Sequence, residues 1–151
     1  MPVRILDADD ASLPAALAVE HVGFGAPGTA PGPQAIRERD AAVAQLAEPV
    51  LAHIRERIRR GLSVTAVAEA EYGPVAVGTL RPVGAVAEVV GVATLPAVRR
   101  QGLGGAVTAL LVEHALASGV ETVFLSAASD AIARVYERLG FRRAGTACFI
   151  D

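Results

Sequence analysis

The segment "RRQGLGGAV" (residues 99–107) places three glycines at the start of an apolar run. Glycine costs up to ~1 kcal/mol inside a helix, yet the run that follows has helical spacing as far as Gly119. The first N–H groups of a helix have no partner within it, and the helix dipole adds about half a positive charge there. The segment therefore predicts either an anion-binding loop or a tight turn that needs glycine for a positive φ.

Two nucleotide-binding motifs match this segment poorly. A P-loop has Lys and then Ser or Thr after its last glycine, and neither follows Gly105. A dinucleotide fingerprint would use Gly102 and Gly104, but Val107 occupies the position of its third glycine. It also requires an acidic residue at the end of the next strand, whereas Glu121 begins that strand. An ATP- or NAD-dependent enzyme is therefore disfavoured.

The hydrophobic periodicity on both sides of this segment predicts a mixed α/β (α+β) sheet covered by helices. The predicted elements, in chain order, are a strand within 3–10, helices 11–25 and 34–61, strands 63–70, 74–82 and 85–95, helix 102–119, strand 121–128, helix 129–140 and one last strand, 141–150. Ser12 is the expected N-cap of the first helix. Pro49 predicts a kink or a restart in the second helix, after which Leu51, Ile54 and Ile58 recur at helical spacing.

The composition argues against several classes of protein. Of the 151 residues, 52% are hydrophobic and only 4% aromatic, which predicts a core of small aliphatic side chains. The net charge of −2 gives no general attraction to nucleic acid or anionic lipid, so neither is expected as a partner. Cys148 is the only cysteine and His21, His53 and His114 have no metal-ligand spacing, so we expect no metal. With no signal peptide or membrane-spanning run, the expectation is a cytoplasmic soluble domain.

Two motifs carry a family resemblance. The pattern R-x-x-G-x-G (Arg99, Gly102, Gly104), entered from "EVVGVATLP" (88–96), resembles the acyl-CoA pyrophosphate motif of the GNAT N-acetyltransferase superfamily. The segment "ARVYERLGFRRAG" (133–145) resembles the second signature of that family, a Tyr-x-x-x-Gly-Phe helix and strand. A helix and a strand separate the two, as they do in the family.

The resemblance implies a single GNAT domain over 1–151, with the first strand and acceptor-side helices in 3–61 and the acetyl-CoA-binding core in 62–151. The implied fold is a mostly antiparallel sheet of about six to seven strands flanked by helices, with a V-shaped splay between the fourth and fifth strands. A bulge in the fourth strand helps to open this splay in the family. Gly91 is the candidate position for the bulge.

The resemblance also implies how the chain holds acetyl-CoA. The amides from Arg100 to Ala106 would hold the pyrophosphate, and strand 92–94 would offer its backbone to the pantetheine arm. Many relatives carry Asn where Ser129 stands, so its contact with that arm is less secure. The implied cofactor-binding residues are Val92, Ala93, Thr94, Arg99, Arg100, Gln101, Gly102, Leu103, Gly104, Gly105, Ala106, Ser129 and Tyr136.

Tyr136 matches the family's tyrosine that donates a proton to the departing CoA thiolate; the alternative is that it only packs in the helix. Acetylation of an amine also needs a base, for which Glu88 is the candidate, with Glu69 and Glu71 as alternatives. Glu88 is expected to share one side of its strand with Val90 and Val92, where desolvation would raise its pKa. A solvated strand carboxylate is the competing interpretation.

The predicted activity is transfer of an acetyl group from acetyl-CoA to a primary amine, by direct attack within a ternary complex. A non-catalytic acyl-CoA-binding module is the alternative. The acceptor, a small molecule or a peptide amine, would be chosen by residues 11–61, and loop 25–34 is either a plain connection or a flap over it. A homodimer is also considered, since dimers are common in the family and "TACFID" (146–151) is a candidate edge strand.

Overall fold

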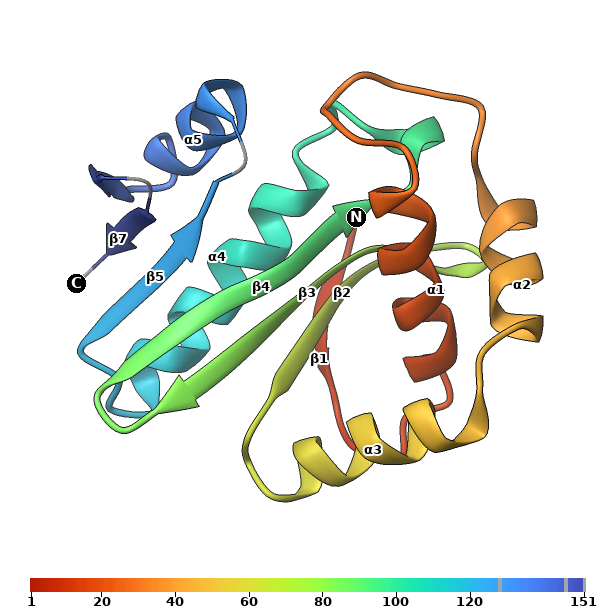
Figure 1. Cartoon of the computed structure of the whole chain (residues 1–151), viewed down its shortest axis with the longest axis horizontal. Helices are drawn as coiled ribbons and strands as arrows, with labels where there is room; N and C mark the ends of the chain where they lie inside the picture. Colours follow the sequence, from red (N-terminus) through yellow and green to blue (C-terminus); the bar gives the residue numbers. More distant parts are fainter. Residues whose placement is uncertain (128, 146, 151) are drawn as a thin grey trace.

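The computed structural model describes residues 1–127, 129–145 and 147–150, and its strands form one sheet. The strands are β1 (Val3–Leu6), β2 (Val64–Ala70), β3 (Gly73–Val83), β4 (Val86–Thr94), β5 (Thr122–Ser126), β6 (Arg142–Ala144) and β7 (Ala147–Ile150). The helices are α1 (Leu13–Phe24), α2 (Ile36–Ala44), α3 (Glu48–Arg59), the 3-10 helix η1 (Pro96–Val98), α4 (Leu103–Ala117) and α5 (Asp130–Glu137). The spatial order of the strands is β1-β2-β3-β4-β5-β7-β6 (Figure 1), and only β4 and β5 pair in parallel among the described residues.

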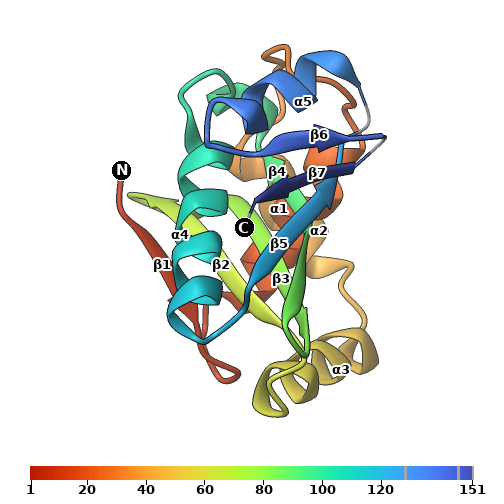
Figure 2. The same cartoon turned by 90° about the vertical axis from the view of Figure 1, so that its left-hand side faces the viewer.

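Helices cover both faces of the sheet (Figure 2). Helix α4 packs on β2, β3 and β4 from one side, and α1 packs on β3 and β4 from the other, with α2 against α1. The core between them is aliphatic, as the composition predicted, and its largest fully buried side chains include Leu6, Leu13, Leu80, Leu95, Leu111, Val67, Val77 and Val107. Within the described part of the chain, no helix combines the length and apolar character needed to cross a membrane.

Strands β4 and β5 separate soon after they meet. Their ladder consists of Val86↔Thr122, Ala87↔Val123 and Glu88↔Phe124. Beyond Glu88, β4 continues to Thr94 with no further β5 partner among the described residues, while β5 continues its pairing with β7 on the other side. The predicted V-shaped splay between the fourth and fifth strands is therefore confirmed.

Strand β4 also contains the predicted bulge at Gly91. The register with β3 on either side of it is Thr79↔Val90 and Val77↔Ala93. Gly78 therefore faces two residues of β4, Gly91 and Val92, and the strand bends locally. Gly91 has a φ of +63°, in the left-handed region that glycine adopts without a steric penalty.

The bulge moves Val92 to the face of the sheet opposite Glu88 and Val90. A Cβ placed on Gly78 would lie 3.4 Å from Val92 and 2.9 Å from Val107 of α4, so Val92 is on the α4 face. The register and the alternation along the strand place Glu88 and Val90 on the face that α1 covers. The prediction that all three share one side of β4 is wrong, because it assumed an unbroken alternation.

The second predicted helix restarts, as Pro49 indicated. Helix α2 ends at Ala44 and α3 begins at Glu48, which puts the proline in the first turn, where no N–H is needed. Leu51, Ile54 and Ile58 pack against the core from α3, as their spacing predicted.

Ser12 precedes α1, but its side chain makes no capping hydrogen bond. Its hydroxyl instead accepts a hydrogen bond from Arg4 at 3.3 Å, and its backbone N–H donates to Asp10 at 2.9 Å. Asp10 and Glu69 also pair with the Arg4 guanidinium. Ser12 therefore does not cap α1 but belongs to an ion-pair cluster that joins β1 and β2 to the turn before α1.

The chain does not close with one strand over 141–150, as predicted, but with the hairpin β6–β7. Gly145, with a φ of +70°, reverses the chain between the two strands. Strand β7 then lies between β5 and β6, so the segment considered as a dimer edge is interior over 147–150. Residues 146 and 151 of that segment lie outside the described residues.

Candidate active site

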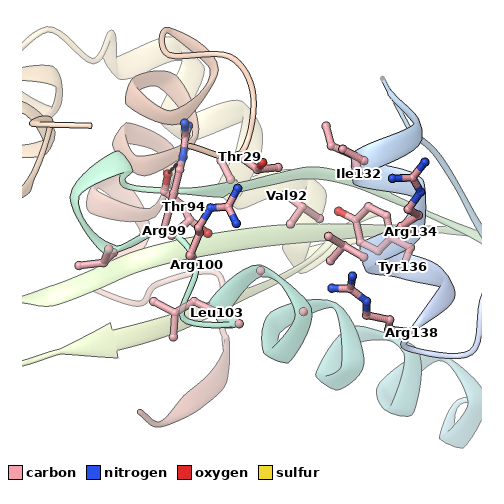
Figure 3. A pocket seen from close by; sticks show the side chains of 17 residues that line it. Thr29, Val92, Thr94, Arg99, Arg100, Leu103, Ile132, Arg134, Tyr136 and Arg138 are labelled. Carbon is pink, nitrogen blue, oxygen red and sulfur yellow. Dashed lines mark hydrogen bonds between the residues drawn. The ribbon is translucent and has the colours of Figure 1, made fainter. Parts of the chain in front are cut away.

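A cavity of about 560 Å³ lies where β4 leaves β5 (Figure 3). Its walls are the end of β4, the loop and first turn of α4, one face of α5, and Thr29 from the loop before α2. The predicted site residues that line it are Val92, Ala93, Thr94, Arg99, Arg100, Gly102, Leu103, Gly104, Gly105 and Tyr136. Gln101, Ala106, Ser129 and Glu88 are predicted site residues that do not line it.

The loop before α4 presents a row of unpaired N–H groups. Among the described residues, no acceptor is found for the backbone N–H groups of residues 100–105, whereas Ala106 donates to the Gly102 carbonyl at 3.0 Å. Arg100 and Gly102 have φ of +65° and +75°, a left-handed geometry that turns successive amides toward a concave surface. A Cβ on Gly104 would lie 3.4 Å from Val92, so glycine also keeps this surface open toward β4. The arrangement fits a diphosphate group.

Arg99 is held by main-chain carbonyls rather than presented freely to an anion. Its guanidinium donates to the carbonyls of Gly23 at 2.9 Å, Ala30 at 3.2 Å and Thr94 at 3.3 Å. It therefore joins the end of α1, the loop 25–34 and the end of β4. The loop is further fixed where the Gly32 N–H donates to Pro96 at 3.1 Å.

Three other arginines line the cavity with no carboxylate partner among the described residues: Arg100, Arg134 and Arg138. Arg134 and Arg138 are four residues apart on the exposed face of α5, at its end. Sequence reasoning missed both, although their spacing around Tyr136 places them on one side of the predicted helix. They add positive charge to the wall that faces the amide row.

Tyr136 projects from α5 into the cavity (Figure 3) and is only 9% exposed. Its ring packs edge-on against Phe141, with centroids 5.9 Å apart. Burial raises the pKa of the Tyr136 phenol, and a hydrogen bond with the hydroxyl of Thr108 opposes this effect. The phenol therefore keeps its proton at neutral pH, as a proton donor must. Thr108, fully buried on α4, was not singled out from the sequence.

Ser129 caps α5, where its side-chain oxygen accepts a hydrogen bond from the Ile132 N–H at 3.3 Å. Ile132 lines the cavity and Ser129 does not, so the serine acts on the site through the helix that it begins.

The predicted bases lie away from this cavity. Glu88 lines a second cavity, of about 370 Å³, with Arg57, Arg81 and Phe124 at the other end of β4. Glu69 pairs with Arg4 at 2.9 Å and Glu71 is exposed in the β2–β3 turn. The carboxylate found at the bulge of β4 belongs instead to Glu20 of α1, which no motif in the sequence singles out.

Residues 34–141, more than half of the chain, match the Acetyltransferase (GNAT) family. The chain belongs to this family. No curated protein matches it in sequence.

Solved structures with the same fold extend over nearly the whole chain. An acetyltransferase from Trypanosoma brucei is 26% identical, with a TM-score of 0.68 over 95% of this chain and 93% of that one. The PaiA N-acetyltransferase from Thermoplasma acidophilum, solved with coenzyme A, is 14% identical, with a TM-score of 0.64 over 99% and 97%. A predicted acetyltransferase from Clostridium acetobutylicum, solved with acetyl-CoA, is 17% identical, with a TM-score of 0.63 over 95% and 91%. The sheet with its splayed strands is thus the GNAT fold.

Proposed function

We propose that the chain is an N-acetyltransferase that moves an acetyl group from acetyl-CoA to a primary amine by direct attack within a ternary complex. The row of unpaired amides beside the splayed end of β4 carries this proposal. Family membership and the coenzyme A and acetyl-CoA complexes of two similar structures support it.

The residues at the cavity fit the parts of acetyl-CoA. The unpaired amides of residues 100–105 would hold the pyrophosphate, with Arg100 supplying charge, whereas the Ala106 N–H is engaged by the Gly102 carbonyl. The edge of β4 at residues 92–94 would offer N–H and C=O groups to the amides of the pantetheine arm. When bound, acetyl-CoA supplies an activated thioester carbonyl as the group that the amine attacks.

Tyr136 would give its proton to the sulfur that leaves. Its phenol lines the cavity, is buried, and is protonated at neutral pH, and burial raises its pKa further. Cys148 is buried in β7 and does not line the cavity, so direct transfer is favoured over an acetylated cysteine.

The test has two readouts, thermal unfolding with each ligand and release of free CoA thiol with a panel of amines and peptides. A ligand at a hundred times its Kd stabilises the folded protein by about 2.7 kcal/mol, so acetyl-CoA should raise Tm clearly. At least one amine should accelerate thiol release. A Tm shift with ATP or NADH but none with acetyl-CoA would contradict the proposal.

A Tm shift with acetyl-CoA and no thiol release with any amine would instead favour the non-catalytic acyl-CoA-binding module. The amines that work would show whether the acceptor is a small molecule or a peptide.

A further inference from the structure

Glu20 places a carboxylate directly against the bulge of β4. A Cβ on Gly91 would lie 3.0 Å and 3.2 Å from its two oxygens, so any side chain there would be in tight contact with the carboxylate. The side chain is half-buried where α1 packs on β3 and β4.

The bulge adjoins the cavity that holds Tyr136. Gly91 is followed by Val92, the first residue of β4 that lines this cavity, and both lie beyond the last rung shared with β5 at Glu88. No strand of the described sheet covers the β5-facing edge of β4 here. A ligand that extends along this edge from residue 94 toward the bulge therefore has Tyr136 on one side of the sheet and Glu20 on the other.

The surroundings of Glu20 suit a proton acceptor. Burial raises the pKa of its carboxyl group, and the positive charge of Arg81 on β3 lowers it by less. The other charged groups on elements packed against α1 are Glu88 of β4 and Arg37, Glu38, Arg39 and Asp40 of α2. Arg39 is engaged by Asp40 and by the Pro74 carbonyl, so its charge is already paired away from Glu20.

We propose that Glu20 is the general base that takes a proton from the ammonium group of the acceptor. This inference rests on the acetyl transfer proposed above. It assigns to Glu20 the role of base for which Glu88 was the candidate from the sequence. The neutral amine attacks the thioester carbonyl, so that a C–N bond forms and the C–S bond breaks with its electron pair on sulfur. Tyr136 protonates the sulfur, the second proton lost by nitrogen restores the phenol through solvent, and Glu20 passes its proton to water.

Glu88 fits this role less well because of where β4 is paired. Its backbone is in the ladder with Phe124, and its side chain lines the second cavity with Leu62 and Pro82. It is three positions along the strand from Gly91, at about 3.3 Å per residue. The Glu20 carboxylate lies against Gly91, next to the cavity-lining Val92, whereas Glu88 does not line that cavity.

The test is the variant Glu20→Gln, assayed from mildly acidic pH to above the pKa of the best amine. At neutral pH, kcat/KM should fall by about 100-fold, because the ammonium form is no longer deprotonated by the enzyme. The deficit should shrink as pH rises and the amine becomes neutral in solution. The Tm shift caused by acetyl-CoA should not change.

A second readout separates catalysis from packing. A carboxyl group with a raised pKa in the folded state contributes stability below its unfolded pKa and loses it as pH rises. At neutral pH, Glu20→Gln should therefore have a Tm equal to or above that of the wild type. Glu113→Gln, an exposed carboxylate of α4, is the matched control and should change neither rate nor pH profile.

Three results would overturn the inference. One is a wild-type rate and pH profile in Glu20→Gln, and another is the pH-dependent loss appearing in Glu88→Gln instead. A third is an equal loss at every pH with a lower Tm, which would mean that Glu20 only packs. If the wild type releases no thiol with any amine, both the proposed function and the role of Glu20 are contradicted.

Discussion

The two ends of β4 have opposite relations to the strand beside them. At Val86–Glu88 the main chain is hydrogen-bonded to β5, and at 92–94 it has no strand partner on that side within the described sheet. The N–H and C=O groups of a paired strand are hydrogen-bonded to its neighbour, whereas those of an unpaired edge can bind another extended chain. One strand therefore holds the sheet together at one end and offers a binding edge at the other, and the bulge at Gly91 divides them.

The charges at the two ends differ in the same way. The cavity at the paired end contains Arg57 and Arg81 together with Glu88, so opposite charges lie close to one another. The cavity at the splayed end is lined by four arginines and, among its lining residues, no carboxylate. Only the second is suited to a ligand that carries several negative charges.

Gly104→Val should have the largest effect on the splayed end of β4. A Cβ on Gly104 already lies 3.4 Å from Val92, so the two γ-methyl groups of valine would fill the surface beneath the amide row. We expect acetyl-CoA affinity to fall by about 100-fold, equivalent to about 2.7 kcal/mol, in a ligand titration. Val86→Ala, at the paired end, should leave the affinity unchanged. Equal effects of the two variants would refute the division of β4.

Tyr136→Phe tests the chemistry assigned to the splayed end. Removal of the phenol proton should lower kcat by about 100-fold, while the Kd of acetyl-CoA changes by less than about threefold, because the ring still packs on Phe141. Stopped-flow or steady-state thiol release, together with a binding titration, measures both quantities. A parallel fall in kcat and affinity would assign Tyr136 to packing.

Gly91→Ala tests the boundary between the two ends. An alanine at a φ of +63° costs about 1–2 kcal/mol, and its Cβ must also displace the Glu20 carboxylate at 3.0 Å. The matched control is Gly84→Ala in the β3–β4 turn, with a φ of +60° and nothing within 4 Å of a Cβ. Chemical denaturation should show a larger loss of stability for Gly91→Ala, and only that variant should slow transfer. Equal losses, with transfer unaffected, would show that the bulge has no role in the reaction.

Arg138→Gln should have the smallest effect. An exposed charge near a bound phosphate contributes about 0.5–1 kcal/mol, so acetyl-CoA affinity should weaken by about two- to fivefold. The loss should shrink as salt is added, because screening already weakens the interaction. Arg60→Gln on α3 is a control with the same change in net charge. A loss that is independent of salt would contradict an electrostatic role.

The parts of the site that could be predicted from the sequence are those set by neighbours along the chain. The glycines at 102 and 104 and the tyrosine at 136 lie in short motifs whose local geometry follows from their own residues. The bulge at Gly91 was predictable for the same reason, since a glycine inside a strand has few other uses.

The remaining features depend on contacts between distant segments. The position of Glu20 depends on how α1 packs over β4, and nothing in its own helix distinguishes it from other surface glutamates. The face of the sheet on which Val92 lies depends on the β3–β4 register, in which Gly78 faces two residues of β4. The last hairpin depends on the positive φ of Gly145, which makes this residue a turn inside what the sequence pattern predicts as one strand.

Arg99 holds the loop 25–34 through hydrogen bonds that do not depend on the side chains of the loop. All three groups that accept its hydrogen bonds are main-chain carbonyls, at Gly23, Ala30 and Thr94. Every amino acid supplies such a carbonyl, so substitutions within the loop leave the acceptors in place. The loop can therefore vary its side chains, and with them the surface beside the cavity, while it stays attached to β4.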